Sequence, residues 1–137
     1  MSIPEGFRPH TRRSAVTDPW RPIYALEHED RIDLALTITE NHCNGRGFLH
    51  GGVIAALADN AMGLSLGQSC RQAGRAHRGA VTMGLSVDYV RRAEPGQWLL
   101  VAPRVLKAGR RTGTVDALIT ADGAMVARAN ATFALAG

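Results

Sequence analysis

The chain has 137 residues, of which 45% are hydrophobic and 20% charged. This length suits one domain with its own hydrophobic core, and the composition excludes a disordered chain or a fibrous repeat. The net charge of +4 is uneven, because residues 1–68 carry −2 and residues 69–137 carry +6. All the basic residues except Lys107 are arginine, whose planar guanidinium suits phosphate and carboxylate, so the second half is expected to meet an anionic ligand.

Several classes of protein are disfavoured. The longest apolar run, within residues 53–66, is interrupted by Asp59 and Asn60 and is too short to span a bilayer. Residues 1–14 lack the apolar core of a secretory signal, so we expect a cytoplasmic protein with no membrane partner. Cys43 and Cys70 form no CxxC pair, and the histidine spacings do not suit a metal site, so reduced thiols and no metal are expected. No basic helix or aromatic platform is evident, which argues against nucleic-acid binding.

The first third of the chain predicts an arm, a strand hairpin and a loop. Residues 1–19 show no periodicity and are expected to form an N-terminal arm, followed by one domain over residues 20–137. Apolar and polar residues alternate strictly over 31–40, which is typical of a half-buried strand, and residues 23–30 are its candidate hairpin partner. Asparagine and glycine over residues 41–48 indicate a loop.

Residues 50–67 predict one long helix. The segment is rich in Ala, Leu and Met, opens with a glycine pair and is expected to end near Gly67, after which residues 69–79 continue it briefly or form a polar loop. Its surface is apolar nearly all round, which is typical of a buried helix, and its small residues allow another element to approach closely.

Four strand patterns follow, over residues 80–90, 97–107, 112–121 and 124–135, and turn signals separate them. Consecutive strands joined in this way predict an antiparallel meander, in which Pro103 marks a bulge or an edge position. With a single long helix, the economical α+β architecture is an antiparallel sheet curved around that helix, which is the hot-dog arrangement.

Asp59 is the first candidate for chemistry, because it lies mid-helix among neighbours that cannot pair with a charge. A buried, unpaired carboxylate is costly unless its pKa rises or a partner arrives from elsewhere in the fold. Two interpretations stay open. Asp59 is a functional carboxylate, or it reaches solvent or pairs across the fold.

The triplet His50-Gly51-Gly52 opens the helix. Glycine leaves backbone N–H groups unobstructed, and a helix N-terminus stabilises developing negative charge, which an acyl-transfer oxyanion requires. The alternative is that the glycines only allow a tight entry turn and that His50 stabilises this turn by a hydrogen bond.

Gly51 and Asp59 are separated by eight residues, or about 12 Å along one helix, which is too far to serve a single carbonyl carbon. If both act in one site, they come from different subunits. Two such helices running antiparallel across a two-fold axis would give two equivalent sites per dimer.

The residues that carry this pattern match a known family. Asn44, the His50-Gly51-Gly52 triplet, Ala58-Asp59-Asn60-Ala61, Thr82 and the segment LSVDYVRRAEPG resemble the hot-dog acyl-CoA thioesterases of the phenylacetate-pathway (PaaI) type, over roughly residues 31–135. The resemblance implies that Asp59 is the nucleophile or general base and that the Gly51 N–H is the oxyanion donor. It also implies that Asn44 and His50 shape the surroundings, that Thr82 positions the attacking water, and that the protein is a dimer of dimers with its sites at a dimer interface.

The chain departs from that family at Arg92, where the family often has proline, and Ser86 competes with Thr82 as the polar residue on the same strand face. Contacts to the substrate are predicted for Gly52 and for four arginines near strand ends, which could grip the phosphates of coenzyme A or simply be solvated: Arg91, Arg92, Arg110 and Arg111. Trp98 and Tyr89 alternate with apolar neighbours and are expected in the core.

Hydrolysis of an acyl-CoA thioester is therefore the expected function, with no cofactor. A non-catalytic module that binds acyl-CoA or an aromatic ligand is the first alternative, and the intact Asp59 and glycine pair argue against it. A hydratase or dehydratase on the same fold is the second. Such enzymes normally use an Asp and His pair, and no histidine lies within a turn of Asp59.

Overall fold

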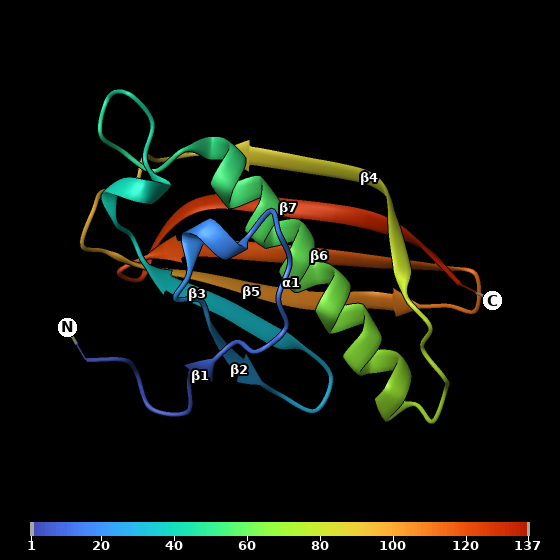
Figure 1. Ribbon diagram of the computed structural model, residues 1–137. Helices are drawn as coiled ribbons and strands as arrows, with labels where there is room; N and C mark the ends of the chain where they lie inside the picture. The colour runs from blue at the N-terminus through green and yellow to red at the C-terminus, as the bar shows by residue number, and fades with distance from the viewer. Residues whose placement is uncertain (1, 137) are drawn as a thin grey trace.

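The long helix α1 (Gly51–Gln72) lies across one face of a seven-stranded sheet (Figure 1). This computed structural model describes residues 2–136. Its other elements are β1 (Arg8–Pro9), η1 (Asp18–Trp20), β2 (Tyr24–Glu27), β3 (Ile32–Thr37), η2 (Glu40–His42), β4 (Ala80–Tyr89), β5 (Trp98–Ala108), β6 (Thr112–Ala121) and β7 (Ala124–Leu135). Every strand pair is antiparallel, so the expected hot-dog fold is confirmed.

The strand order is β1-β2-β3-β5-β6-β7-β4, which corrects the predicted four-strand meander. Strands β5, β6 and β7 do form a meander, and the hairpin of β2 with β3 is confirmed. However, β4 pairs with β7 and not with β5. The chain crosses the sheet through α1 before β4 begins, so β4 is added at the far edge, where no strand within residues 2–136 pairs with its outer backbone groups.

A bulge in β4 decides which of its side chains face the helix. The register with β7 shifts between Thr82 and Gly84, so Thr82 is opposite the buried Phe133 while Ser86 is opposite the exposed Asn130. One extra residue in a strand reverses the alternation of side chains beyond it. Thr82 therefore faces the helix and Ser86 the opposite side of the sheet, although plain alternation places both on one face.

Strand β3 is buried on both faces, unlike the half-buried strand that its alternation predicts. Residues 32–36 are all buried, including Asp33, which is only 5% exposed. This carboxylate is compensated locally, since its oxygens lie 3.0 Å from His28 Nε2 and 3.2 Å from Arg31 Nε. At Asp33, ion pairing thus replaces the solvent that the alternating pattern predicts.

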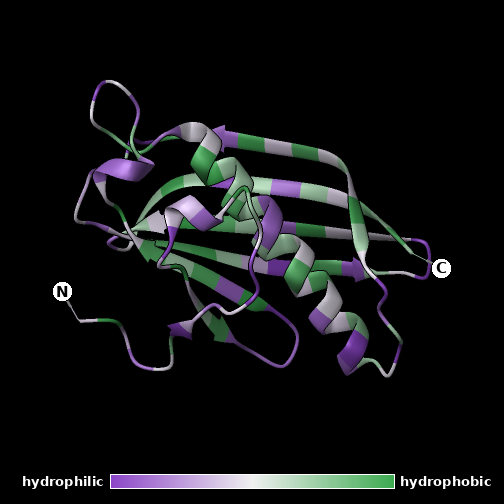
Figure 2. Ribbon diagram, viewed as in Figure 1, coloured by the Kyte–Doolittle hydropathy of each residue, from purple (hydrophilic) through white to green (hydrophobic). Residues whose placement is uncertain are grey.

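Helix α1 continues past Gly67, where the sequence predicts its end. A Cβ at Gly67 would lie 2.9 Å from the ring of His77 and 3.2 Å from a guanidinium nitrogen of Arg71, so this glycine serves close packing and not termination. Hydrophilic residues of the helix appear midway along it and again near its C-terminal end (Figure 2). A stripe remains only half-buried in the single chain, and it consists of Ala55, Ala56, Asp59, Asn60, Gly63 and Leu64.

Ser65 anchors the helix to the sheet. Its fully buried hydroxyl donates to the Ile32 carbonyl at 3.1 Å and accepts from the Ile32 N–H at 3.0 Å. Ser65→Ala is expected to lower the free energy of unfolding by about 1–3 kcal/mol, because both backbone groups of Ile32 lose their partner away from water. Urea unfolding followed by circular dichroism measures this loss. Ser69→Ala is the control, since the Ser69 hydroxyl binds the Asp30 carbonyl at a more exposed position, and equal losses for the two variants would contradict this account.

The N-terminal arm is bound to the domain. Strand β1 pairs with β2, and Arg21 donates to the carbonyls of His10 at 2.6 Å and Arg12 at 3.0 Å. Between these points the arm crosses the side of α1 that faces away from the sheet (Figure 1). Within residues 2–136, no helix combines the length and apolar character needed to cross a membrane.

Candidate active site

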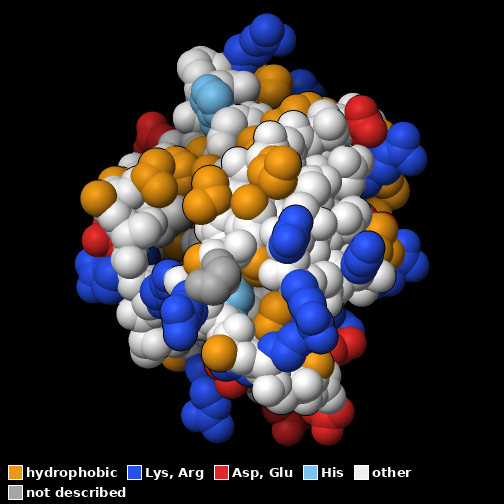
Figure 3. All heavy atoms as spheres, turned by 90° about the vertical axis from the view of Figure 1, so that its right-hand side faces the viewer, with side chains coloured by type: hydrophobic (Ala, Val, Ile, Leu, Met, Phe, Trp, Pro, Cys, Tyr) orange, Lys and Arg blue, Asp and Glu red, His pale blue; other side chains and the backbone are white. Residues whose placement is uncertain are grey.

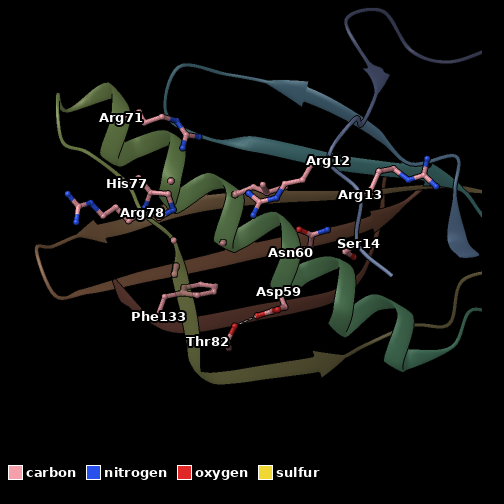
Figure 4. Close-up of a pocket in the computed structure, with 15 residues that line it drawn as sticks. Arg12, Arg13, Ser14, Asp59, Asn60, Arg71, His77, Arg78, Thr82 and Phe133 are labelled. Atoms are coloured by element: carbon pink, nitrogen blue, oxygen red, sulfur yellow. Dashed lines mark hydrogen bonds between the residues drawn. The ribbon is translucent and has the colours of Figure 1, made fainter. Parts of the chain in front are cut away.

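Asp59 is half-buried on the face of α1 that is directed at β4 (Figure 4). The Thr82 hydroxyl donates a 2.6 Å hydrogen bond to Asp59 Oδ1, so the partner that the helix itself cannot supply comes from β4. Among the described residues, nothing donates to the second carboxylate oxygen. The carboxylate is thus held in one orientation and keeps an oxygen available for a water or a substrate.

The start of α1 has an N–H group without an acceptor. His50 is the N-cap, and its Nδ1 accepts the Gly52 N–H at 2.8 Å, which is the turn-stabilising hydrogen bond that the sequence left as an alternative. This bond uses the Gly52 N–H. No residue of the 2–136 segment accepts from the Gly51 N–H, which points out of the first turn with the positive end of the helix dipole.

Both glycines lie close to a neighbouring side chain. A Cβ at Gly51 would lie 3.2 Å from the ring of Tyr89, and one at Gly52 would lie 2.9 Å from His50 Nδ1. The Tyr89 hydroxyl donates to the Gly51 carbonyl at 2.6 Å, and burial raises the pKa of this hydroxyl, which favours the protonated donor. Tyr89 is 51% exposed, so its predicted place in the core is wrong. Trp98 is partly buried and packs against the rings of Phe7 and Tyr24.

Asn44 shapes the loop that leads to the helix. Its side-chain oxygen accepts from the backbone N–H groups of Arg46 at 2.9 Å and Phe48 at 3.4 Å. The backbone N–H of Asn44 donates to the Phe48 carbonyl. An isolated antiparallel β-bridge between the backbones of Cys43 and Leu49 closes the same loop. The loop is therefore rigidly connected to the first turn of α1.

The candidate site residues form two separate groups within a single chain. Asn44, His50 and Gly51 lie at the start of α1, whereas Asp59 and Thr82 lie about 12 Å further along the helix. A cavity of about 520 Å³ adjoins the second group. Besides Asp59 and Thr82, its lining includes five basic side chains that the sequence did not single out: Arg12, Arg13, Arg71, His77 and Arg78. The +6 charge of residues 69–137 was the available signal for Arg71 and Arg78. No pattern in the N-terminal arm indicated a role for Arg12 or Arg13.

The four arginines predicted to bind phosphate do not meet within one chain. Arg91 and Arg92 follow the C-terminal end of β4, whereas Arg110 and Arg111 lie in the turn between β5 and β6, at the opposite end of the sheet. Arg91 donates to the Met125 carbonyl at 3.3 Å, and Arg92 pairs with Glu94 at 3.1 Å. The end of the molecule that carries the β5–β6 turn shows basic side chains across its middle and acidic ones nearer its margin (Figure 3).

Metal-ligating residues do not gather in the part of the chain that the structure describes. No group of three or more His, Cys, Asp or Glu side chains in residues 2–136 is arranged to hold an ion. Cys43 and Cys70 are free thiols, and burial raises the pKa of Cys43, which keeps it protonated.

Comparison with known proteins identifies the family. The model of the thioesterase superfamily matches residues 46–127, which include the start of α1, Asp59 and Thr82. The chain belongs to the thioesterase superfamily. It is 35% identical over 136 residues to the Pseudomonas aeruginosa protein named "Putative esterase PA0474", with 98% of each chain covered. It is also 29% identical over 100 residues to human acyl-coenzyme A thioesterase 13, covering 72% of this chain and 68% of the human protein.

Solved structures agree with this assignment. The Streptococcus mutans protein smu.793, solved bound to acetyl CoA, has a TM-score of 0.73 at 28% identity, covering 82% of this chain and 87% of that one. The Escherichia coli PaaI protein shares the fold, with a TM-score of 0.74 at 24% identity over 84% of this chain and 80% of its own. The thioesterase family that the sequence motifs indicate is thereby confirmed, and the likeness to the PaaI protein is one of fold.

Proposed function

We propose that this protein hydrolyses an acyl-CoA thioester, with Asp59 as the catalytic carboxylate and the Gly51 N–H as the oxyanion donor. The observation that carries the proposal is the Asp59 carboxylate, oriented by Thr82 and open to a cavity, on a helix that begins with an N–H lacking an acceptor. The human relative is named as an acyl-coenzyme A thioesterase, and the Streptococcus mutans neighbour was solved with acetyl CoA, which supports this substrate class.

The chemistry requires a base and a donor on opposite sides of the thioester carbon. As general base, Asp59 removes a proton from water while the water oxygen bonds to the carbonyl carbon, and the Gly51 N–H stabilises the negative oxygen that forms. The C–S bond then breaks, and the leaving thiolate of coenzyme A receives the proton from Asp59. Direct attack by a carboxylate oxygen of Asp59 would instead break the C–S bond, release the thiolate of coenzyme A and form an acyl-aspartyl anhydride. Water would then hydrolyse the anhydride to the free acid and the Asp59 carboxylate, and its remaining proton would go to the thiolate.

A dimer would bring the two halves of the site together. Strand β4 is an edge strand with exposed apolar side chains, including Val81 at 69% and Met83 at 64% exposure. Antiparallel pairing of β4 with its copy would continue the sheet and place the half-buried small-residue stripes of two α1 helices face to face. Gly51 of each chain would then approach Asp59 of the other. A further association into a tetramer is part of the same proposal.

The same pairing would unite the dispersed arginines. Antiparallel β4 strands place the C-terminal end of one strand beside the N-terminal end of the other, so Arg91 and Arg92 of one subunit approach the sheet end that carries Arg110 and Arg111 of its neighbour. Four guanidinium groups at that position suit the phosphates of coenzyme A.

Subunit complementation tests the shared site. Asp59→Asn and Gly51→Pro homodimers are each expected to be nearly inactive. After subunit exchange between equal amounts, about a quarter of wild-type activity should return, because half of the dimers are mixed and each mixed dimer has one intact site of two. Analytical ultracentrifugation confirms that the variants still associate. If both halves served within one chain, mixing would restore nothing.

Release of free thiol from a panel of acyl-CoA esters tests the reaction itself. Wild-type protein is expected to turn over at least one ester class, from short, medium, long and aryl acyl groups, at a rate that depends on Asp59. If no ester is turned over although the esters bind, the protein is a binding module and the proposed function is wrong.

A further inference from the structure

The cavity beside Asp59 is unlike an apolar acyl pocket. Binding pockets for uncharged ligands are lined predominantly by hydrophobic side chains. Here the only sizeable apolar side chains among the fifteen lining residues are Leu64 and Phe133, whereas four arginines and a histidine contribute to the wall. The only carboxylate in the lining is Asp59, whose Oδ1 is bound by Thr82.

Most of these cations have no anionic partner. Arg13 is paired with Asp18 at 2.9 Å, and in Figure 4 it is directed away from the cavity. Among the described residues, by contrast, no ion pair joins Arg12, Arg71 or Arg78 to any carboxylate, and the only hydrogen bond of the Arg71 side chain goes to the neutral amide of Gln68 at 3.3 Å. Clustered arginines without counter-ions raise the positive potential of a partly enclosed site and favour an anionic ligand there.

The pKa of His77 is affected by this positive potential. Burial, together with the guanidinium groups of Arg71 and Arg12, lowers the pKa of the His77 imidazole. The fold also makes room for this arrangement, because Gly67 lacks the Cβ that would collide with His77 and with Arg71. The basic end of the cavity is therefore packed around a glycine of the helix and does not consist of loose surface side chains.

The distance between Asp59 and the basic cluster suits a substrate that carries a thioester at one end and an anionic group at the other. Gly67, against which Arg71 and His77 pack, lies eight residues after Asp59, or about 12 Å along the axis of α1. One cavity wall thus runs from the catalytic carboxylate to the basic cluster, and Figure 4 shows Arg12 lying over the helix between them.

Resting on the proposed function, we infer that the substrate is the mono-CoA ester of a dicarboxylic acid, with its free carboxylate bound by Arg71, Arg12 and His77. Guanidinium groups bind carboxylates through paired hydrogen bonds, whereas a neutral acyl chain would leave these cations in contact with hydrocarbon. Arg78, which also lines the cavity, adds to the same potential. The arm that supplies Arg12 thereby becomes part of the specificity site.

The phosphates of coenzyme A are also negatively charged. An experiment can distinguish binding of these phosphates from binding of the free carboxylate of the acyl group. Phosphate is present in every ester and in free coenzyme A, whereas the distal carboxylate is present only in the dicarboxylic series. The experiment measures kcat/KM for adipoyl-CoA against hexanoyl-CoA and for suberoyl-CoA against octanoyl-CoA, with wild type and Arg71→Gln. Succinyl-CoA against butanoyl-CoA serves as the pair that is too short to span the distance. Arg104→Gln is the matched control, since it removes the same charge from the outer face of the sheet, where Arg104 pairs with Asp116.

Wild type and Arg104→Gln are expected to prefer at least one of the two longer dicarboxylic esters by about 10- to 100-fold over its neutral partner, which is the effect of hydrogen bonds to a charged group. Arg71→Gln should lose about tenfold of that preference. Equal kcat/KM values for dicarboxylic and neutral esters in wild type would overturn the inference. So would an Arg71→Gln variant in which both series fall equally, because the cluster would then bind coenzyme A itself.

Equilibrium binding separates this inference from the proposed reaction. Calorimetric titration of Asp59→Asn with suberoyl-CoA, octanoyl-CoA and free coenzyme A measures the preference without turnover. Tighter binding of suberoyl-CoA, weakened by Arg71→Gln, supports the carboxylate site even if no ester is hydrolysed, in which case only the proposed function fails. Turnover of esters without any difference in binding would reject the carboxylate site and leave the thioesterase activity intact.

Discussion

Asp59→Asn is expected to lower kcat/KM for thioester hydrolysis by about 10²–10⁴, which is the usual contribution of a positioned general base. The amide oxygen of asparagine can still accept the hydrogen bond from Thr82, so the local structure should be retained. Thermal unfolding is expected to change little, because the side chain is only half-buried. Thiol release with single-ester kinetics measures the loss.

A positional control distinguishes a catalytic base from a general contribution of charge. Asp59 and Asn60 both line the cavity, so the double variant Asp59→Asn/Asn60→Asp keeps the composition and the charge while moving the carboxylate by one residue. We expect it to be as inactive as Asp59→Asn. Recovery of activity in the double variant, or full activity in Asp59→Asn, would show that the carboxylate bound by Thr82 is not the catalytic group.

Gly51→Pro is expected to lower kcat by about 10²–10³ with little change in KM, because it removes the N–H that stabilises the oxyanion only during reaction. The site tolerates proline for a structural reason. Gly51 is the first residue of α1, where proline is common, and the preceding His50 has φ −70° and ψ 130°, which are values that a following proline permits.

Gly51→Ala is the matched control for this prediction. Both substitutions add a Cβ that would lie 3.2 Å from the Tyr89 ring, so both require that ring to move, but alanine keeps the N–H. We therefore expect Gly51→Ala to be more active than Gly51→Pro by at least tenfold. Equal loss in the two variants would mean that the contact with Tyr89, and not the N–H, determines activity.

The local pattern of the sequence predicts most of the elements well. The strand segments 112–121 and 124–135 are observed at these bounds, and the Asp122-Gly123 turn between them has φ values of +48° and +85°, as a two-residue hairpin requires. These features depend on residues close together in the chain. The brief continuation of the helix into residues 69–79, one of the two expected alternatives, is observed as far as Gln72. The helix passes Gly67, a residue type that often ends helices, because this glycine packs against His77, a contact that no local pattern contains.

The choice of Thr82 as the polar partner of Asp59 also depends on contacts that are distant in sequence. Thr82 and Ser86 are separated by four residues, and alternation places both on one face of a strand. A bulge that depends on pairing with β7 puts only Thr82 beside the carboxylate. The position of β4 within the sheet could not be predicted either. Strand β4 follows α1 in sequence but pairs with β7 at the sheet edge, and this pairing joins segments that are far apart in the chain.

By itself, the sequence determined the single helix with its central carboxylate, the glycine pair at its start, the four C-terminal strands and the basic second half, since these follow from residue periodicity, turn residues and charge. The distance of about 12 Å from Gly51 to Asp59 also followed from helix geometry alone. Only the tertiary structure decided which hydroxyl binds Asp59, the place of β4 at the sheet edge, and the meeting of Arg12 from the arm with Arg71 and His77 around one cavity. Those features depend on contacts between residues far apart in the chain, which are selected by packing and strand register and leave no periodic trace in the sequence.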